Sequence, residues 1–162
     1  MSEIIIKIIM TAIATVGFAV IFKTKVRHLP AITVGGMVAG TIFILLDLAG
    51  ANLFVSNFLA VAALAVLSEI FARIFRAPTA IFLLPGTIIL FPGGSLYYAM
   101  SGLILKDLDF AAQSGKSALL IGLGIAGGMI AGSVLCSIVT KAIDKWHTEK
   151  SKVYKEDKEE TK

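Results

Sequence analysis

The chain has 162 residues, of which 57% are hydrophobic, and its formal net charge is +4. Its mean hydropathy is +0.88, and several apolar runs approach the length that crosses a bilayer, which argues against a soluble domain. We therefore predict an all-α integral membrane protein, in which the positive charge reflects membrane topology and not a nucleic-acid partner.

The hydropathy pattern predicts five transmembrane helices, at residues 4–22, 31–51, 53–72, 79–103 and 117–140. The first apolar run is long, and Lys23 and Lys25 follow it where a signal peptide would have a small-residue cleavage site. We therefore expect the first run to be kept as a helix. Together the five helices are expected to form one transmembrane domain over residues 1–140.

Basic residues predict the orientation of the chain. Clusters of Lys and Arg follow the first, third and fifth helices, which end on the same side of the membrane if five helices cross it. The positive-inside rule makes this side the cytoplasm and places the N-terminus outside. Residues 141–162 mix lysines with acidic residues, so we expect a charged cytoplasmic tail that is partly disordered.

A small-residue pattern occurs twice in the chain. Gly35-Gly36-Met37-Val38-Ala39-Gly40 in the second helix resembles Gly127-Gly128-Met129-Ile130-Ala131-Gly132 in the fifth. The spacing of Gly36 with Gly40, and of Gly128 with Gly132, lets helix backbones approach closely, so we expect these residues to pack against helices of this chain or of a partner. Both an inverted repeat and chance in a glycine-rich membrane protein would produce the similarity, and the sequence leaves both open.

Three ionisable residues in or beside the second and third predicted helices are candidates for coupling or gating. Glu69 and Arg73 are four residues apart near the cytoplasmic end of the third helix, so their side chains share one face. They form either a gating or coupling pair, or a boundary pair whose arginine reaches the lipid phosphates. Asp47 lies near the outer end of the second helix, where it either takes part in proton coupling or reaches the outer water.

The fourth helix contains two Pro-Gly breaks. Proline lacks the backbone N–H, and glycine allows backbone conformations that other residues avoid. Backbone groups freed within a bilayer must face protein or a water-lined cavity, and the N-terminus of a half-helix can hold a carboxylate. We therefore predict a substrate site here, and the alternative is a kinked structural helix with interfacial tyrosines. The predicted substrate-binding residues are Pro85, Gly86, Pro92, Gly93, Gly94, Ser95, Tyr97 and Tyr98.

No catalytic, cofactor or metal site is predicted. His28 and His147 lie in a loop and in the tail, without the spacing of a metal site or a catalytic triad. Gly115-Lys116-Ser117 lacks the upstream glycine of a phosphate loop, because that position is Phe110. Cys136 is the single cysteine, which excludes an internal disulfide. We therefore do not expect an enzyme.

Several segments resemble the threonine/serine exporter family. The resemblance is closest to the small subunit of the split, two-gene form, which corresponds to the C-terminal half of the fused exporters, and it covers about residues 8–140. The Pro-Gly segment is its most specific part. The matching segments are Thr15-Val16-Gly17-Phe18-Ala19-Val20-Ile21-Phe22, Val26-Arg27, Pro78-Thr79 and Phe91-Pro92-Gly93-Gly94-Ser95-Leu96-Tyr97-Tyr98-Ala99-Met100.

The resemblance implies a subunit of a secondary exporter of small polar metabolites in the bacterial inner membrane. Such an exporter is coupled to the proton motive force and needs a larger membrane subunit, and threonine and serine are its favoured substrates. Dicarboxylates such as succinate are an alternative cargo, and a non-transporting assembly or scaffold subunit is an alternative role. Both cargo classes carry a carboxylate, which suits a site lined by backbone amides. Association with further copies of the chain is left open.

Overall fold

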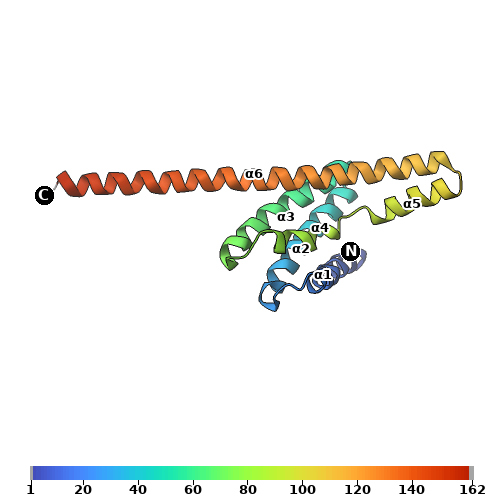
Figure 1. The fold of residues 1–162 in the computed structure, drawn as a ribbon, viewed down its shortest axis with the longest axis horizontal. Helices are drawn as coiled ribbons and strands as arrows, with labels where there is room; N and C mark the ends of the chain where they lie inside the picture. Colours follow the sequence, from blue (N-terminus) through green and yellow to red (C-terminus); the bar gives the residue numbers. More distant parts are fainter. Residues whose placement is uncertain (1, 161–162) are drawn as a thin grey trace.

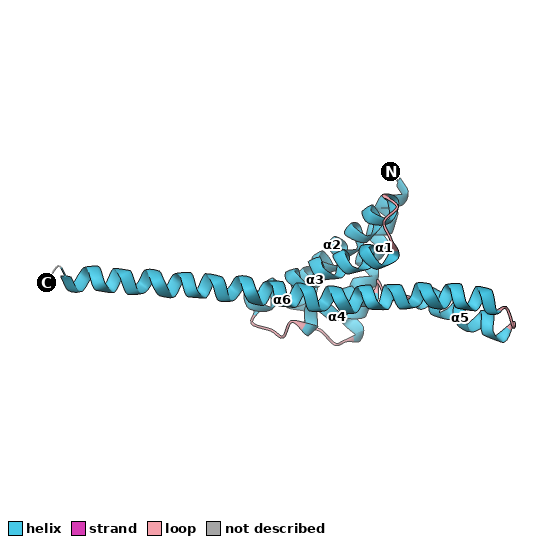
Figure 2. Cartoon of the chain, turned by 90° about the horizontal axis from the view of Figure 1, so that it is seen from above, coloured by secondary structure: helices cyan, strands magenta, loops and turns pink. Residues whose placement is uncertain are grey.

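The structure is a computed structural model, which describes the backbone of residues 2–160 and the side chains of residues 4–139. Figure 2 shows helices joined by short loops, with no strand among the described residues. The helices, drawn in Figure 1, are α1 (Ser2–Ile21), the 3-10 helix η1 (Val26–His28), α2 (Leu29–Leu48), α3 (Leu53–Phe75), α4 (Ala80–Ile88), α5 (Gly93–Ile104) and α6 (Leu108–Glu160).

Among the described residues, four helices are long and apolar enough to cross a bilayer. The pair α4 and α5, bent by 48° at its break, brings the number to five if the pair counts as one broken span. The predicted all-α membrane fold with an interrupted fourth segment is therefore confirmed. The predicted first break, at Pro85-Gly86, was wrong. The helix α4 continues through Pro85, and only residues 89–92 interrupt the segment. Pro85 removes a single hydrogen bond from α4, and its buried position keeps that turn packed as a helix.

Basic residues end three of the helices. Lys23 follows α1, Arg76 follows α3 and Lys106 follows α5, with φ angles of 52°, 51° and 60°. A left-handed residue after a helix turns the chain away from the helix axis, and a positive charge there interacts favourably with the helix dipole. At the start of α6, the carboxylate of Asp107 accepts a hydrogen bond from the amide of Phe110 at 3.1 Å, which caps the longest helix.

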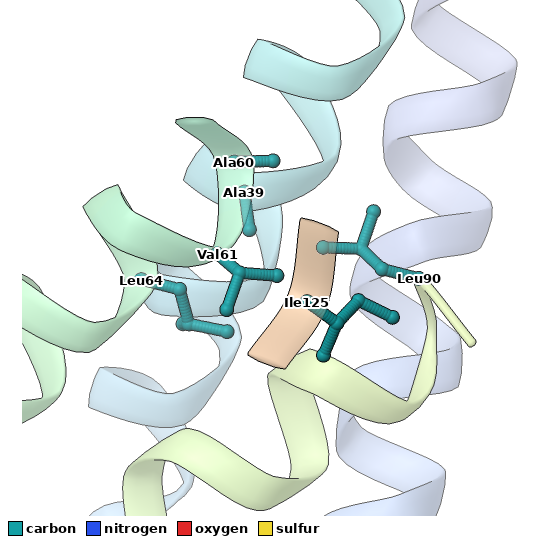
Figure 3. Close-up of a cluster of buried hydrophobic side chains, with 6 residues drawn as sticks. All are labelled: Ala39, Ala60, Val61, Leu64, Leu90 and Ile125. Atoms are coloured by element: carbon teal, nitrogen blue, oxygen red, sulfur yellow. The ribbon is translucent and has the colours of Figure 1, made fainter. Parts of the chain in front are cut away.

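The helix α3 is the centre of the bundle. It packs against α2, α4 and α6, while α1 covers α2 (Figure 1). One apolar cluster joins α2, α3, α6 and the break after α4 (Figure 3), and a second lies further along α3. The first consists of Ala39, Ala60, Val61, Leu64, Leu90 and Ile125, and the second of Ala19, Ala31, Ile32, Ala72 and Phe82.

The glycine pair of α2 lies where α2 crosses α1. A Cβ added at Gly36 would collide with the side chain of Thr15, and a Cβ added at Gly40 would lie 2.6 Å from Cγ2 of Thr11. Thr15 is fully buried at this crossing. Because Gly36 and Gly40 lack side chains, α1 can approach α2 closely at this crossing.

The glycine pair of α6 lies where α6 crosses α3. A Cβ added at Gly128 would lie 2.5 Å from the carbonyl oxygen of Phe58, and one added at Gly132 would lie 2.6 Å from that of Ala62. These neighbours are backbone atoms, which cannot turn aside as a side chain can. The two glycine pairs thus serve packing within this chain, each against a different helix.

The helix α6 is much longer than a bilayer span. Its apolar part is Leu108–Val139, so the fifth helix begins earlier than the predicted residue 117, and its backbone continues as a helix to Glu160. The helix α5 runs beside the first part of α6, and the two form a hairpin that extends away from the bundle (Figures 1 and 2). Most of the predicted tail extends α6, and its side chains lie outside those that the structure describes.

Candidate functional site

A cavity of about 490 Å³ adjoins the break between α4 and α5. Its volume lies in the range of small-molecule sites in proteins. Residues of α1, α2, α3, the break, α5 and α6 contribute to its wall, so the cavity exists only when these parts of the chain come together. Its lining includes Lys7, Thr11, Gly40, Phe43, Asn57, Ile89, Leu90, Phe91, Pro92, Gly94, Ser95 and Ile121.

The break leaves backbone groups without helical partners. Pro92 has no N–H to donate, and the N–H of Gly93 donates to the carbonyl of Phe91 at 2.8 Å. In a continuous helix the N–H of Gly93 would instead donate to the carbonyl of Ile89. Ile89, which lines the cavity, therefore has a carbonyl that has lost its helical donor. Such a carbonyl can accept a hydrogen bond from a bound solute.

The helix α5 begins at the cavity. Its first four amides have no acceptor one turn earlier within α5. Two of them find an acceptor just ahead of the helix, because the N–H of Gly93 donates to the carbonyl of Phe91 and the N–H of Leu96 donates to the carbonyl of Pro92 at 3.0 Å. Gly94 and Ser95 carry the other two amides, and both residues line the cavity. The N-terminal end of α5 thus presents N–H groups and the positive end of a helix dipole, an arrangement that binds anions.

Three polar residues outside the predicted site also line the cavity. Thr11 of α1 supplies a hydroxyl that donates to the carbonyl of Lys7, Lys7 supplies a positive charge, and Asn57 of α3 supplies a carboxamide that is 1% exposed. The Nδ2 of Asn57 donates to the carbonyl of Leu53 at 2.7 Å, whereas its Oδ1 has no partner. A polar amide among the apolar residues near the start of this helix was the available sign of a functional role. The sequence does not show that α3 brings this amide to the break.

The structure brings together three of the eight predicted substrate-binding residues, Pro92, Gly94 and Ser95. Gly93 begins α5 directly after the break but is not among the residues that line the cavity. Pro85 and Gly86 are buried in α4, where a Cβ added at Gly86 would lie 2.9 Å from Cδ2 of Leu64. Here the glycine makes room for a side chain of α3.

The two tyrosines after the break lie outside the cavity. Tyr97 is 68% exposed and Tyr98 is 53% exposed. Their rings make a T-shaped, edge-to-face contact with centroids 5.6 Å apart, and the ring of Tyr98 also approaches that of Phe110 on α6. The two tyrosines therefore belong to the exposed surface of the hairpin of α5 and α6.

The three predicted coupling or gating residues do not line the cavity. In the part of the chain with described side chains, no ion pair joins Glu69 to Arg73, and Arg73 is exposed while Glu69 is half-buried. Asp47 is exposed near the C-terminal end of α2. Their roles in coupling stay predictions. Among the described residues, no group of three His, Cys, Asp or Glu residues is placed to hold a metal ion.

Comparison with known protein families gives a match over most of the chain. The family model described as "Threonine/Serine exporter, ThrE" matches residues 7–135. This range reaches into every helix from α1 to α6 and contains all the residues that line the cavity except Ile6. No curated protein and no solved structure matches the chain significantly.

Proposed function

The chain belongs to the threonine/serine exporter family, and from this membership we propose that it is the small subunit of a two-component secondary exporter. Its cargo is a small polar metabolite, with threonine and serine favoured over dicarboxylates such as succinate. A larger membrane subunit completes the transporter, and the proton motive force drives it. The observation that carries this proposal is the cavity at the break between α4 and α5, whose lining includes free backbone groups and a lysine.

The carboxylate of the cargo binds at the N-terminal end of α5. The amides of Gly94 and Ser95 donate to its oxygens, and Lys7 contributes a positive charge from α1. Charge-assisted hydrogen bonds are roughly twice as strong as neutral ones, and they gain strength where water is scarce. The hydroxyl of Ser95 adds a further group that can donate or accept. Together these groups take the place of water around a charged solute within the membrane.

The proposed orientation in the inner membrane places the N-terminus outside and the C-terminus in the cytoplasm. Lys7 and Asn57 lie near the N-terminal ends of α1 and α3, so the cavity then belongs to the outer half of the bundle. Towards the cytoplasmic ends, the apolar clusters around Leu64 and Phe82 close the bundle. Export requires these clusters to part, so that the cavity is reached in turn from each side.

The test is efflux of labelled threonine, serine and succinate from cells that lack their own exporters. The cells express this chain, the larger subunit encoded beside it, or both, and the amount of each chain in the membrane is measured. We expect efflux of threonine and serine only when both chains are present. If both chains accumulate and none of the three solutes leaves faster than from empty cells, the exporter proposal fails and a scaffold role is supported.

Two variants connect the efflux to the cavity. Ser95→Ala removes a hydroxyl that lines the cavity, whereas Tyr97→Phe removes a hydroxyl from the exposed surface two residues later. We expect Ser95→Ala to lower threonine efflux and Tyr97→Phe to leave it unchanged at equal amounts of protein. The reverse result would place the site on the outer face of the hairpin. Reporter fusions at the two ends of the chain test the proposed orientation separately.

A further inference from the structure

We propose that Asn57 determines which cargo the cavity accepts, because its Oδ1 accepts a hydrogen bond from the ammonium group of an α-amino acid. The site would then select a zwitterion over a dicarboxylate or a simple hydroxy acid. This inference rests on the proposed function and deepens it, since it decides between the two cargo classes on the basis of one side chain.

The orientation of the Asn57 amide follows from its hydrogen bond. The carbonyl of Leu53 can only accept, so the side-chain atom that lies 2.7 Å from it is the Nδ2 nitrogen. The Oδ1 oxygen is therefore the atom that has no partner in the described part of the chain. A buried acceptor without a donor is unfavourable, and in native proteins such atoms mark places where a ligand, a water or a second conformation completes the bond.

The surroundings of Asn57 favour a ligand that carries both charges. The amides of Gly94 and Ser95 and the ammonium group of Lys7 supply donors and positive charge at the cavity. The Oδ1 of Asn57 supplies an acceptor, and Ile89, whose carbonyl has lost its helical donor, also lines the cavity. An α-amino acid offers a carboxylate to the donors and an ammonium group to the acceptors. A dicarboxylate would instead bring a second set of acceptor oxygens against Oδ1, which is itself an acceptor and cannot donate to them.

Binding at Asn57 also requires movement. The side chain is 1% exposed, so an ammonium group reaches Oδ1 only when the amide turns or the break moves away from α3. A ligand shifts a protein towards the conformation in which it makes additional contacts. An amino acid gains a hydrogen bond from this movement, and a solute without an ammonium group gains none. The same side chain therefore links the choice of cargo to a change of conformation.

Ser56 offers a matched control. It precedes Asn57 on α3, is equally buried and also has an unpaired oxygen, but it is not among the residues that line the cavity. If any loss of a buried polar group in this turn of α3 impaired transport, Ser56→Ala would do so as well. If the loss of transport depends on the cavity, a change at Asn57 impairs transport and Ser56→Ala does not.

The experiment compares the transport of L-threonine and 3-hydroxybutyrate, which is threonine without its ammonium group. Everted membrane vesicles containing this chain and its larger subunit take up each labelled solute, with succinate as a third probe. We expect the wild type to prefer threonine, and Asn57→Leu to lower threonine uptake about tenfold or more, as for a lost hydrogen bond to a charged group. Uptake of 3-hydroxybutyrate should not change. The ratio of the two uptakes in the same vesicles does not depend on the amount of folded protein.

The outcomes separate this inference from the proposed function. If Asn57→Leu lowers both uptakes equally, or if Ser56→Ala changes the ratio as much, Asn57 has a structural role and the inference is wrong while the exporter stands. A wild type that prefers succinate overturns the inference and the favoured cargo, while the two-component exporter stands. The variant Asn57→Asp retains an acceptor and must keep the preference for threonine, even if it is made in smaller amounts. Absence of uptake for all three solutes would overturn both proposals.

Discussion

Replacing Gly128 by alanine tests the crossing of α6 and α3. The added Cβ would lie 2.5 Å from the carbonyl oxygen of Phe58 and 3.1 Å from the amide nitrogen of Ala62. Carbon–oxygen contacts are ordinarily about 3.3–3.6 Å, so α6 must move about 1 Å away from the backbone of α3. Overpacking of this kind costs about 1–3 kcal/mol.

The control is Gly122→Ala on the same helix, where nothing lies within 4 Å of the added Cβ. Both substitutions gain the same helix propensity, about 1 kcal/mol, so their difference isolates the contact with α3. We expect Gly128→Ala to be less stable than Gly122→Ala by about 1–3 kcal/mol. The free energy of unfolding is measured for the purified chain in mixed micelles, by titration with dodecyl sulfate and circular dichroism. Equal stabilities of the two variants would refute the proposed crossing of α3 and α6.

Three further predictions follow from single contacts. Gly86→Ala should destabilise the chain less than Gly128→Ala in the same titration, because its neighbour is the flexible side chain of Leu64 and not backbone; a larger loss would contradict this packing. Lys7→Met should lower threonine efflux about tenfold while Lys7→Arg retains most of it, because the positive charge is proposed to hold the carboxylate. Equal efflux from both variants would exclude that role. Asp107→Ala should destabilise α6 by about 1 kcal/mol through loss of its cap, and Asp107→Asn should not; equal effects of the two would show that the cap contributes nothing.

The fold was largely predictable because a bilayer imposes strong rules on sequence. A span needs about 20 apolar residues whose backbone groups are satisfied within the helix, so the apolar runs mark the helices directly. The break at Pro92 was also predictable, because the missing N–H and two following glycines act locally. Pro85 has the same local signal but lies within α4, since packing against its neighbours decides whether a helix tolerates one missing hydrogen bond.

The candidate site was predicted only where its residues are close together in the sequence. Pro92, Gly94 and Ser95 follow from the break itself, and the structure places them at the cavity. Tyr97 and Tyr98 share the same stretch of sequence, yet the direction of α5 turns them to the outer surface. Proximity along the chain thus identified the break but not which of its side chains face inwards.

The sequence by itself determined the membrane class, the helices, the interrupted fourth segment and the small residues that permit close crossings. Each of these depends on the composition of one segment and its fit to a lipid environment. Only the tertiary structure decided that Lys7 of α1 and Asn57 of α3 line the cavity together with the start of α5. These residues are far apart in the chain, and their meeting depends on which faces the helices turn towards one another when they pack.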